Sequence, residues 1–402
     1  MIEMAFETEE TQQSHCPSKL RKENHGPCVG IIGGGQLSRM LCIAAAQLGI
    51  QTVTVERKAN CPAAAVSHLH QVGDWNDPAV LRQLAAQADV VTLENEFVNA
   101  ETLAILETEN VRILPSSECL RTIQDKLIQK EALQTAGLPT PCFRATDSSD
   151  ELQEAGSEFG YPFVLKRRRN GYDGKGNITI KTAQDLKTGW AVLDGDNHPL
   201  FAEEFCPFKA EIAVMVCRSS SGQTVVYPVV ETVQKEHICH IVKAPAAIPA
   251  STSAQAIRIA TDAVSSVKGI GSIGVELFLT QDDQIVVNEL APRVHNSGHY
   301  TIEACHTSQF ENHIRAVLGL PLGNPDLIEP AAVMINLLGD AAGPSYPSGV
   351  CEAMKVDGAH LHLYGKDQSQ FGRKMGHLTV TGNSMESVMS RAESAAKKIT
   401  FA

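Results

Sequence analysis

Residues 274–299, GVELFLTQDDQIVVNELAPRVHNSGH, contain the pattern that decides the fold of this chain. Two apolar runs rich in β-branched residues flank the polar tetrapeptide QDDQ at 281–284, and this arrangement predicts a β-hairpin. If the turn is symmetric about its centre, Glu276 lies directly opposite Glu289. Like charges that face each other across two strands repel, and a divalent cation between them would turn the repulsion into binding. Because both ligands are hard oxygens, the hairpin predicts a magnesium site.

Three basic side chains follow the hairpin closely, since Arg293, His295 and His299 lie in an irregular segment marked by proline and glycine. Two carboxylates and three basic groups that converge after one hairpin indicate phosphate chemistry. The alternative is an edge hairpin whose glutamates are solvated, because a register slip of one residue would remove their pairing. This stretch alone leaves both interpretations open.

The overall composition excludes several classes of protein. With 402 residues, the chain can form two or three domains that each bury a sizeable core. Apolar residues make up 43% and charged residues 20%, as in an ordinary soluble globular protein, and the net charge of −12 argues against a nucleic-acid partner. No apolar run approaches the roughly 20 residues that a membrane-spanning helix needs, so no membrane partner is expected.

Cysteines, histidines and the N-terminal residues favour a cytoplasmic protein. Eleven cysteines without a Cys-x-x-Cys pair indicate reduced thiols rather than disulfides or a zinc site. The fourteen histidines show no metal-binding spacing, and the pairs His68, His70 and His360, His362 are interpreted as structural or solvent-facing. Residues 1–26 are polar, mixed in charge and without the apolar core of a secretory signal, which predicts a disordered tail.

The N-terminal part alternates apolar strands, the last of them at 112–114, with helices, which predicts a parallel, doubly wound sheet. The glycine turn 33–35 forms a partial dinucleotide fingerprint, but Ser38 stands where the third glycine belongs, and Glu56 ends the second strand. A helix that begins after glycines binds any phosphate through its unpaired N–H groups. A phosphorylated substrate is therefore favoured over a nicotinamide cofactor, with simple packing of the helix on the sheet as the alternative.

Two further stretches combine basic side chains with glycines. An apolar strand ends in the basic run KRRR at 166–169, and the glycine loop GYDGKG follows at 171–176. A glycine loop beside cations suits a lid over nucleotide phosphates, where positive charge offsets the charge that develops in phosphoryl transfer. A solvated surface is the alternative. Near the C-terminus, Lys366, Arg373 and Lys374 form a second basic cluster, which is either an anion site or a surface loop.

Six motifs occur in the same order as in a known enzyme family. They are GGGQL (33–37), LKRRRNGYDGKG (165–176), AEEFCPFKAE (202–211), YPVVETVQKEHI (227–238), VNELAPRVHNSGHYTIEACHTSQFE (287–311) and YGKDQSQFGRKMGHL (364–378). On these motifs the chain resembles the ATP-grasp ligases, specifically the 5-(carboxyamino)imidazole ribonucleotide synthases of purine biosynthesis. Other ATP-grasp enzymes share the architecture but not this set of motifs.

The resemblance implies an α/β protein of ATP-grasp architecture. Its parts would be a doubly wound parallel-sheet domain at 27–117, an ATP-grasp domain at 118–320 with a lid subdomain at 144–205, and a small C-terminal domain at 321–402. The implied reaction begins when ATP phosphorylates bicarbonate to carboxyphosphate. Carboxyphosphate then carboxylates the amine of 5-aminoimidazole ribonucleotide, and ADP and phosphate leave. Members of this family are commonly dimers, so a cytoplasmic homodimer is expected.

Matching positions carry the family's site residues over to this chain. The expected ATP contacts are Lys126, Lys166, Gly171, Asp173, Gly174, Lys175, Gly176, Glu203, Glu204, Phe205, Cys206, Glu211, Gln234, Asn288 and Glu289. The expected ligands of Mg²⁺ are Glu276 and Glu289. The expected catalytic residues are Tyr172, Arg293, His295 and Lys366. The expected contacts of the ribonucleotide are Gly33, Gly35, Gln36, Lys366, Arg373 and Lys374.

The chain departs from the family pattern at Asn170 and Ser38, where glycines are usual, and at Gln234, where many bacterial members have a histidine. None of these changes removes a charged group, so an active enzyme is expected. Three rivals remain, namely an ATP-grasp ligase with another acyl donor such as formate, a nicotinamide-dependent oxidoreductase and a catalytically inactive relative. The oxidoreductase would leave the glutamate pair and both basic clusters without a role.

Overall fold

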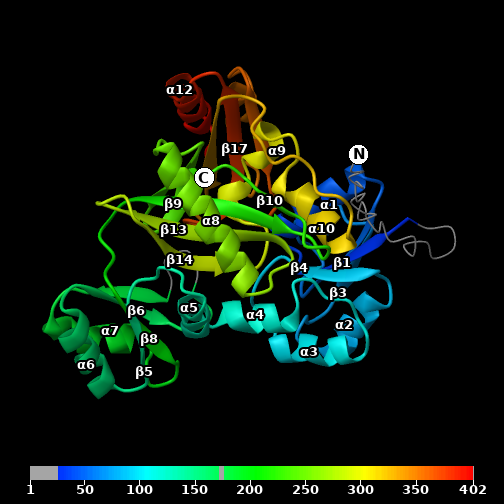
Figure 1. The fold of residues 1–402 in the computed structure, drawn as a ribbon. Helices are drawn as coiled ribbons and strands as arrows, with labels where there is room; N and C mark the ends of the chain where they lie inside the picture. The colour runs from blue at the N-terminus through cyan, green and yellow to red at the C-terminus, as the bar shows by residue number, and fades with distance from the viewer. Residues whose placement is uncertain (1–25, 172–175, 402) are drawn as a thin grey trace, which may run out of the picture.

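The structure, a computed structural model, describes residues 26–171 and 176–401. Within these residues the strands form three sheets with helices packed around them (Figure 1). No helix in the described part is long and apolar enough to cross a lipid bilayer.

The N-terminal sheet is parallel with the strand order β3-β2-β1-β4, which confirms the predicted doubly wound arrangement. Its elements are β1 (Cys28–Ile32), α1 (Gln36–Gln47), β2 (Gln51–Glu56), β3 (Leu69–Val72), α2 (Pro78–Ala85), β4 (Val90–Leu93) and α3 (Ala100–Thr108). Strand β3 was not expected, because its sequence LHQV is polar at the centre and its side chains are partly or fully exposed. The strand expected at 112–114 is reduced to a single bridge between Ile113 and Val91.

The strand order reverses between β1 and β4, and this reversal brings two loops together. In open parallel sheets, ligand crevices form at such a reversal, beyond the carboxyl ends of the strands. The glycine turn follows β1, and Glu94 follows β4. A Cβ atom at Gly35 would lie only 2.6 Å from Glu94 Oε1, and Gly33 has a φ of +104°, which favours glycine. The glycines are therefore needed for the two loops to approach.

The central sheet contains nine strands and continues without interruption into the C-terminal part. Its order is β14-β13-β9-β11-β12-β15-β17-β16, with β10 paired to β9. The strands are β9 (Phe208–Arg218), β10 (Thr224–Val226), β11 (Val230–Lys235), β12 (Ile238–Ala244), β13 (Gly271–Thr280), β14 (Ile285–Ala291), β15 (Ala331–Leu338), β16 (Ala359–Leu363) and β17 (Lys374–Gly382). The antiparallel pair of β12 and β15 makes the link. The segment expected as a separate C-terminal domain thus shares a sheet with the central part.

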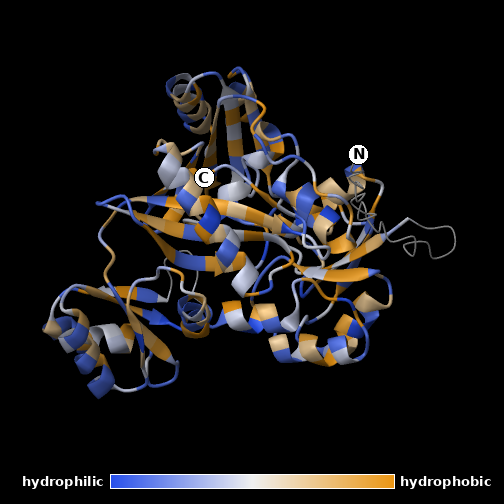
Figure 2. Ribbon diagram, viewed as in Figure 1, coloured by the Kyte–Doolittle hydropathy of each residue, from blue (hydrophilic) through white to orange (hydrophobic). Residues whose placement is uncertain are grey.

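Helices cover this sheet because its strands are apolar on alternate residues. The helices are α8 (Ala250–Ser266), η2 (Asn296–Gly298), α9 (Thr301–Ala304), α10 (Gln309–Leu318), α11 (Val350–Ala353) and α12 (Met385–Ala396). In β13, for example, Ile273, Val275 and Leu277 are buried in one core with Ala256 and Ala260 of α8. Each fully buried aliphatic side chain of this size contributes about 1.5–3 kcal/mol. Figure 2 shows the apolar residues concentrated on the strands of the central sheet.

The third sheet is antiparallel, has the order β5-β8-β6-β7 and stands apart from the central sheet in Figure 1. Its strands and helices are β5 (Phe143–Thr146), α6 (Ser149–Phe159), β6 (Phe163–Arg167), β7 (Asn177–Ile180), η1 (Ala183–Asp185), α7 (Leu186–Val192) and β8 (Leu200–Glu204). It has its own core around Leu152, Phe163 and Leu165. Helices α4 (Ser117–Gln124) and α5 (Lys126–Thr135) connect it to the N-terminal sheet.

The hairpin of β13 and β14 places Glu276 opposite Glu289, as the sequence predicted, but through a different turn. A turn symmetric about its centre would pair Leu277 with Asn288. Instead Leu277 pairs with Val287, and the register shifts by one residue between Leu277 and Glu276. Asn288 is the extra residue of this β-bulge, and a bulge of this kind changes the direction in which a strand presents its side chains. The bulge therefore restores the glutamate pairing.

Candidate active site

Helix α5 carries three polar side chains on one face, and they fasten the hairpin to it. Gln129 and Lys130 follow Lys126 by three and four residues, so the three side chains project from the same side of the helix. The Lys126 ammonium contacts the Glu289 carboxylate. The side-chain oxygen of Gln129 accepts from the backbone N–H of Leu290 at 2.8 Å. The helix thereby fixes the strand that ends in the predicted metal ligand.

A buried carboxylate on β8 holds two lysines. The Glu203 side chain is 2% exposed and pairs with Lys130 Nζ at 2.7 Å and with Lys166 at the end of β6. Burial alone would favour the neutral acid, but the two lysines prevail and lower the pKa of Glu203. Burial lowers the pKa of Lys130. Glu203 therefore fixes Lys166, the cation expected at the nucleotide phosphates, with its side chain as well as offering its backbone.

The basic run after β6 is tied down rather than free on the surface. Arg168 donates to both oxygens of Asp125, from Nε at 2.9 Å and from Nη2 at 2.8 Å. Arg169 lies 3.5 Å from the same carboxylate. Asp125 also accepts from backbone N–H groups at the start of α5 as the N-cap. This clamp holds the strand end against the helix beside Lys126.

The two hairpin glutamates, Glu276 and Glu289, differ in whether a cation compensates their negative charge. Asn288 Nδ2 donates to Glu276 Oε2 at 3.3 Å, and His295 Nε2 lies 3.5 Å from Glu276 Oε1. Burial and the neighbouring Glu289 raise the pKa of Glu276. Burial acts in the same direction on Glu289, but Lys126 outweighs it and lowers the pKa of Glu289. One carboxylate is therefore compensated by a cation and the other is not, so the oxygen cluster fits a second cation of the hardness of Mg²⁺.

In the segment after the hairpin, His295 is bonded to Gln309 through its backbone and packs against Gly274 of the hairpin. The backbone N–H of His295 donates to Gln309 Oε1 at 3.0 Å, and Gln309 Nε2 donates to the His295 carbonyl oxygen at 2.7 Å. A Cβ atom at Gly274 would lie 2.6 Å from His295 Cβ, so only glycine lets the imidazole approach the hairpin this closely. Burial, assisted by two nearby cations, lowers the pKa of His295 to about 3. The ring is therefore neutral at physiological pH.

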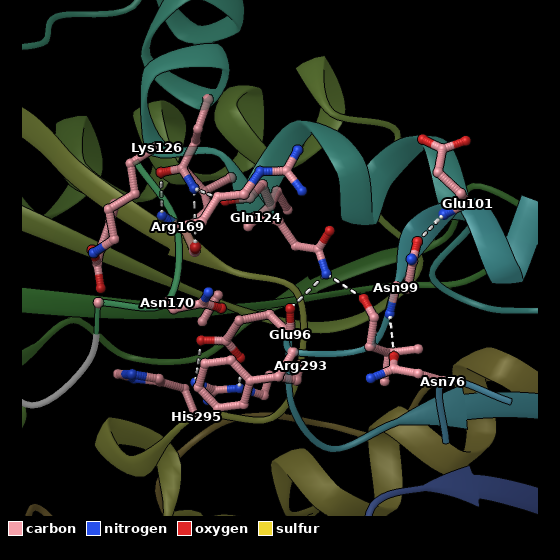
Figure 3. A pocket seen from close by; sticks show the side chains of 18 residues that line it. Asn76, Glu96, Asn99, Glu101, Gln124, Lys126, Arg169, Asn170, Arg293 and His295 are labelled. Atoms are coloured by element: carbon pink, nitrogen blue, oxygen red, sulfur yellow. Dashed lines mark hydrogen bonds and ion pairs between the residues drawn. The ribbon is translucent and has the colours of Figure 1, made fainter. Parts of the chain in front are cut away.

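Arg293 joins the central part to the N-terminal sheet. Its guanidinium donates to Glu96 in a two-point contact, from Nη2 at 2.9 Å and from Nε at 2.5 Å. Burial opposes the charge of Glu96, but Arg293 prevails and lowers the pKa of that carboxyl. Gln124 Nε2 donates to the carbonyl oxygen of Glu96 at 2.6 Å. Figure 3 shows these contacts, which fix the loop after β4 at the site.

A cavity of about 510 Å³ opens at this junction (Figure 3). Its walls include Glu96, Lys126, Asn170, Glu289, Arg293 and His295. These residues come from the loop after β4, from α5, from the segment after β6 and from the hairpin. Cations, carboxylates and amides thus share one concave space between parts of the chain that are far apart in sequence. A space of this size and polarity fits charged small molecules.

The glycine turn holds carboxylates that belong to the chain itself. The backbone N–H of Gly35 donates to Glu94 Oε1 at 2.5 Å, and that of Ser38 donates to Glu94 Oε2 at 2.8 Å. The N–H of Gly34 donates to Glu56 Oε2 at 3.2 Å. The expectation that this turn contacts a substrate phosphate stays a prediction. Of the expected contacts, Gly35 donates its N–H to Glu94, and Gly33 donates its N–H to the carbonyl oxygen of Val55 at 2.9 Å.

The loop between β16 and β17 lies beside the end of β2. Lys58 Nζ is 3.7 Å from Asp367 Oδ2, which joins this loop to the N-terminal part. Within the loop, Arg373 Nη1 donates to Asp367 Oδ1 at 3.1 Å and to the carbonyl oxygen of Gln368 at 2.6 Å. Arg373 is thus held in place by its own loop, and its side chain is 32% exposed.

The other two C-terminal cations lie on either side of this arginine's loop. Lys374 begins β17, and its positive charge acts on both Glu276 and His295. It opposes the rise that burial and Glu289 cause in the pKa of Glu276, and it adds to the fall that burial and Arg293 cause in the pKa of His295. Lys366 Nζ is 5.7 Å from the centre of the Tyr364 ring. The structure therefore brings at least Lys374 to the glutamate pair, from a strand almost a hundred residues further along the chain.

The remaining expected nucleotide contacts lie around the link from the third sheet to the central one. The link contains Glu204 at the end of β8, with Phe205 and Cys206 after it, and Phe205 is 40% exposed. On the central sheet, the Gln234 side chain forms a hydrogen bond with Glu211, whose pKa burial raises. Gln234 and Glu211 are thus neighbours, and their contacts with a nucleotide stay a prediction.

Four of the expected lid residues lie outside the described ones, namely Tyr172, Asp173, Gly174 and Lys175. The two ends of their loop are close together, because a Cβ atom at Gly176 would lie 2.9 Å from Gly171 Cα. Asn170, just before the loop, has a φ of +62°. Asparagine tolerates this left-handed conformation better than most residues, which explains how it stands where the family usually has glycine.

Sequence reasoning missed four polar residues of the site, namely Gln129, Lys130, Glu94 and Glu96. The signal for the first two was their helical spacing from Lys126, which places them on the same face. For the two glutamates, the signal was their position directly after β4, where the strand order reverses.

Comparison with known proteins agrees with this architecture. The ribonucleotide synthetase preATP-grasp domain matches residues 27–124, the ATP-grasp domain matches residues 131–310, and the phosphoribosylaminoimidazole carboxylase C-terminal domain matches residues 332–391. The fold is therefore that of an ATP-grasp protein.

Similar proteins define the family more narrowly. The N5-carboxyaminoimidazole ribonucleotide synthase of Synechococcus elongatus is 43% identical over 356 residues, which cover 88% of this chain and 89% of that protein. The chloroplastic phosphoribosylaminoimidazole carboxylase of Vigna aconitifolia is 42% identical, and this chain spans 65% of its length. The carboxylase of Schizosaccharomyces pombe is 44% identical, and the chain again spans 65% of it.

The solved structures agree. The N5-carboxyaminoimidazole synthase of Aspergillus clavatus, in complex with ADP and 5-aminoimidazole ribonucleotide, has a TM-score of 0.85 at 37% identity and covers 93% of this chain and 99% of its own. The synthetase of Thermotoga maritima has a TM-score of 0.84 at 39% identity, with the same coverage of 93% and 99%. The chain belongs to the N5-carboxyaminoimidazole ribonucleotide synthase family.

The Lys130–Glu203–Lys166 triad yields a stability prediction. Glu203→Gln leaves two lysines facing each other in a buried place without a negative charge. Breaking a buried ion pair from one side costs roughly 3–5 kcal/mol, so we expect the free energy of unfolding in urea to fall by about that amount. The control is Glu204→Gln, the next residue, whose exposed side chain should change stability by at most about 0.5 kcal/mol. Equal losses in both variants would contradict the role of the triad.

Proposed function

We propose that this chain is an ATP-dependent carbon–nitrogen ligase of de novo purine biosynthesis. It carboxylates the amine of 5-aminoimidazole ribonucleotide with bicarbonate and ATP and gives 5-(carboxyamino)imidazole ribonucleotide, ADP and phosphate. The observation that carries the proposal is the convergence of Glu289, Lys126 and the Arg293–Glu96 pair around one cavity. The relatives support it, because a structural neighbour with 37% identity is in complex with ADP and 5-aminoimidazole ribonucleotide.

The first step moves the terminal phosphoryl group of ATP to an oxygen of bicarbonate, which forms carboxyphosphate and ADP. Such a transfer is accelerated mainly by positive charge placed before the reaction around the phosphoryl oxygens. Lys126 and Lys166 are assigned this role, since Glu289 and Glu203 already fix their ammonium groups. The loop 171–176 is assigned to cover the phosphates.

Base and ribose of the nucleotide are assigned to the link after β8 and to the neighbouring central sheet. The backbone of Glu203, Glu204, Phe205 and Cys206 is assigned to the adenine, because a strand end offers N–H and carbonyl groups. Glu211 is assigned to the ribose hydroxyls, and its contact with Gln234 supports this because it orients the carboxyl group.

Magnesium is assigned to Glu276 and Glu289, with Asn288 beside them. The support is the unequal charge balance of the pair, because burial and the facing Glu289 raise the pKa of Glu276. When bound, the ion neutralises charge on the transferring phosphates. The protein's own contribution is the bulge at Asn288 and the contact of Lys126, which hold the carboxylates in register before any ligand arrives.

In the second step, the amine nitrogen of the ribonucleotide attacks the carboxyphosphate carbon. The carbon–oxygen bond to phosphate breaks, phosphate leaves, and the nitrogen loses a proton. We assign the meeting point to Arg293, His295 and Lys366, together with Tyr172 of the loop. Arg293 is oriented by Glu96, so it offers a fixed positive charge to the anionic intermediate.

The 5′-phosphate of the ribonucleotide is assigned to Arg373 and Lys374 of the C-terminal cluster. The residues Gly33, Gly35 and Gln36 of the glycine turn are assigned to the same phosphate. The N–H groups of Gly35 and Ser38 contact the Glu94 carboxylate, so a phosphate that binds at the turn replaces or shares that contact.

We also propose that the protein acts in the cytoplasm as a homodimer. The ten cysteines of the described residues form no disulfides, which suits a reducing compartment. The dimer rests on the resemblance to the family, and light scattering of the purified chain measures it directly.

ADP release by the purified protein tests the proposed function. We expect sustained release with Mg²⁺, ATP, bicarbonate and 5-aminoimidazole ribonucleotide together, and a large drop when either of the last two is left out. Replacing bicarbonate by formate is the control for a different acyl donor. Release that depends on formate, or that ignores the ribonucleotide, would overturn the assignment.

The glutamate pair yields a prediction about catalysis. Glu276→Gln removes one ligand charge of the magnesium site, and a metal contributes several kcal/mol to such a transition state, so we expect turnover to fall roughly a hundredfold or more. The melting temperature without Mg²⁺ should stay equal or rise, because the like-charge repulsion disappears. Asp283→Asn, the same change in the exposed turn of this hairpin, should leave both quantities near the wild-type values. Near-normal turnover of Glu276→Gln would exclude the metal role.

The C-terminal cluster yields a prediction about binding. A cation that holds a substrate phosphate contributes mainly affinity, and such charged hydrogen bonds contribute roughly 1.5–3 kcal/mol. Arg373→Ala should therefore raise the KM for the ribonucleotide by about one to two orders of magnitude. The KM for ATP should hardly change. Lys355→Ala, an exposed cation of the same region, is the control. Equal increases in both KM values would place Arg373 in the nucleotide site or in the fold.

A further inference from the structure

Three potential metal ligands converge where the last strands meet helix α9. They are Glu303 of α9, His362 of β16 and His377 of β17, and one ligand atom of each lies within 4.8 Å of the others. These residues come from three separate elements. None of them belongs to the contacts that we assign to ATP, Mg²⁺ or the ribonucleotide, so the cluster needs an account of its own.

The sheet register creates the histidine pair. His362 and His377 are direct partners in the antiparallel ladder of β16 and β17. Residues paired in this way project from the same face. Accordingly, their rings stack with centres 4.4 Å apart and an angle of 8° between the planes. Glu303 approaches from α9, and its Oε1 accepts from His362 Nε2 at 2.6 Å.

The cluster contains polar atoms that the protein leaves without a partner. His377 is fully buried, yet its Nε2 has no hydrogen-bond partner, and neither has the buried Oε2 of Glu303. An unsatisfied buried polar atom costs roughly 1–3 kcal/mol, and folded proteins contain few of them. Two such atoms lie together in this small cluster, and one ligand between them would satisfy both.

The contact with Tyr364 and the burial of the ring suit His377 to act as a metal ligand. Its Nδ1 lies 3.0 Å from the hydroxyl oxygen of Tyr364. When Nδ1–H donates to that oxygen, the Nε2 lone pair is left for the cluster, and an outer contact of this kind is what orients metal-binding histidines. Burial lowers the pKa of His377, which keeps the ring in the neutral form that ligands require. His299 packs against the same ring, with centres 5.0 Å apart.

We propose that Glu303, His362 and His377 bind a transition-metal dication of the zinc type. Two imidazole nitrogens and one carboxylate oxygen favour Zn²⁺, Co²⁺ or Ni²⁺, whereas Mg²⁺ and Ca²⁺ prefer oxygen ligands. Bonds of about 2.0–2.1 Å require the ligand atoms to close in by roughly 1 Å. The His362 ring must also turn out of its parallel stack, so that its lone pair and that of His377 meet at the ion. The ion takes the place of the proton that now bridges His362 and Glu303. The 28% exposure of the His362 side chain gives access from solvent.

The bound ion ties β16 and β17 to α9, and thus the last strands to the segment that follows the hairpin. A ligand that binds only the folded chain stabilises it by mass action. The expected role is therefore structural, and the inference does not rest on the proposed ligase activity.

The test uses the full chain, treated with EDTA, in excess Mg²⁺ and without nucleotide. The excess Mg²⁺ competes with Co²⁺ for sites made of oxygen ligands, such as the hairpin glutamates. We expect one equivalent of Co²⁺ per chain, with the intense visible absorption of a tetrahedral site. Zn²⁺ should displace the Co²⁺ and raise the melting temperature.

His362→Gln is the main variant, and His360→Gln is the matched control on the same strand, since His360 is exposed. We expect the His362 variant to lose the absorption and at least tenfold in affinity, while the control keeps both. Glu303→Gln, nearly equal in shape, should behave like His362→Gln. Melting temperatures in EDTA show whether each variant is folded, and Glu303→Gln decides the matter if His362→Gln is not. A wild-type chain without the absorption, or equal losses in the variants and the control, would leave a water-bridged hydrogen-bond network only and overturn the proposal.

Discussion

The backbone holds the carboxylates of Glu276 and Glu289 opposite each other, and the placement of the charged groups around them depends on this pairing. The main-chain ladder of β13 and β14 fixes their pairing, so the side chains cannot separate to relieve the repulsion. The neighbourhood must supply positive charge instead, and Lys126 compensates one of the two. The register of the hairpin thus brings two like charges together, and the cations around the hairpin offset their repulsion.

The same rule governs the other cations of the site, because most of them are held by a carboxylate. Lys166 is held by Glu203, Arg168 by Asp125, Arg293 by Glu96 and Arg373 by Asp367. This arrangement explains how a chain with a net charge of −12 can offer positive charge to anionic ligands. The acids outnumber the bases, yet many acids serve to orient individual bases. An anionic substrate therefore meets cations that are already in position.

The sequence predicted the parallel N-terminal sheet and the hairpin because both depend on local patterns, apolar runs and the polar breaks between them. It paired the glutamates correctly but with the wrong turn, since the bulge at Asn288 depends on tertiary contacts that no local pattern encodes. Helix spacing from Lys126 contained the information about Lys130, whereas the partner of Lys130, Glu203, lies 73 residues away and was expected to act through its backbone.

Burial by distant segments accounts for the remaining differences. The glycine turn predicted a phosphate contact, but no local pattern showed that Glu94, which follows another strand, accepts from the N–H groups of Gly35 and Ser38. The histidine pair at residues 360 and 362 was interpreted as structural or solvent-facing. Only the register of β16 with β17 and the approach of α9 show that His362 has a buried histidine and a carboxylate beside it. Clusters assembled from three distant elements have no signature in spacing.

The unbroken central sheet divides the molecule into a stiff and an adjustable part. From β14 to β16, each strand is hydrogen-bonded to its neighbour, so the glutamate pair and the C-terminal cations belong to one framework that bends only at the expense of many hydrogen bonds. The third sheet, within the described residues, pairs with neither of the other two, and side-chain ion pairs such as Lys130–Glu203 and Arg168–Asp125 connect it to helix α5. A rotation of the third sheet would therefore break side-chain ion pairs at α5 but no β-ladder. The central sheet, which carries the glutamate pair and the start of the C-terminal cation cluster, would keep its shape during such a rotation.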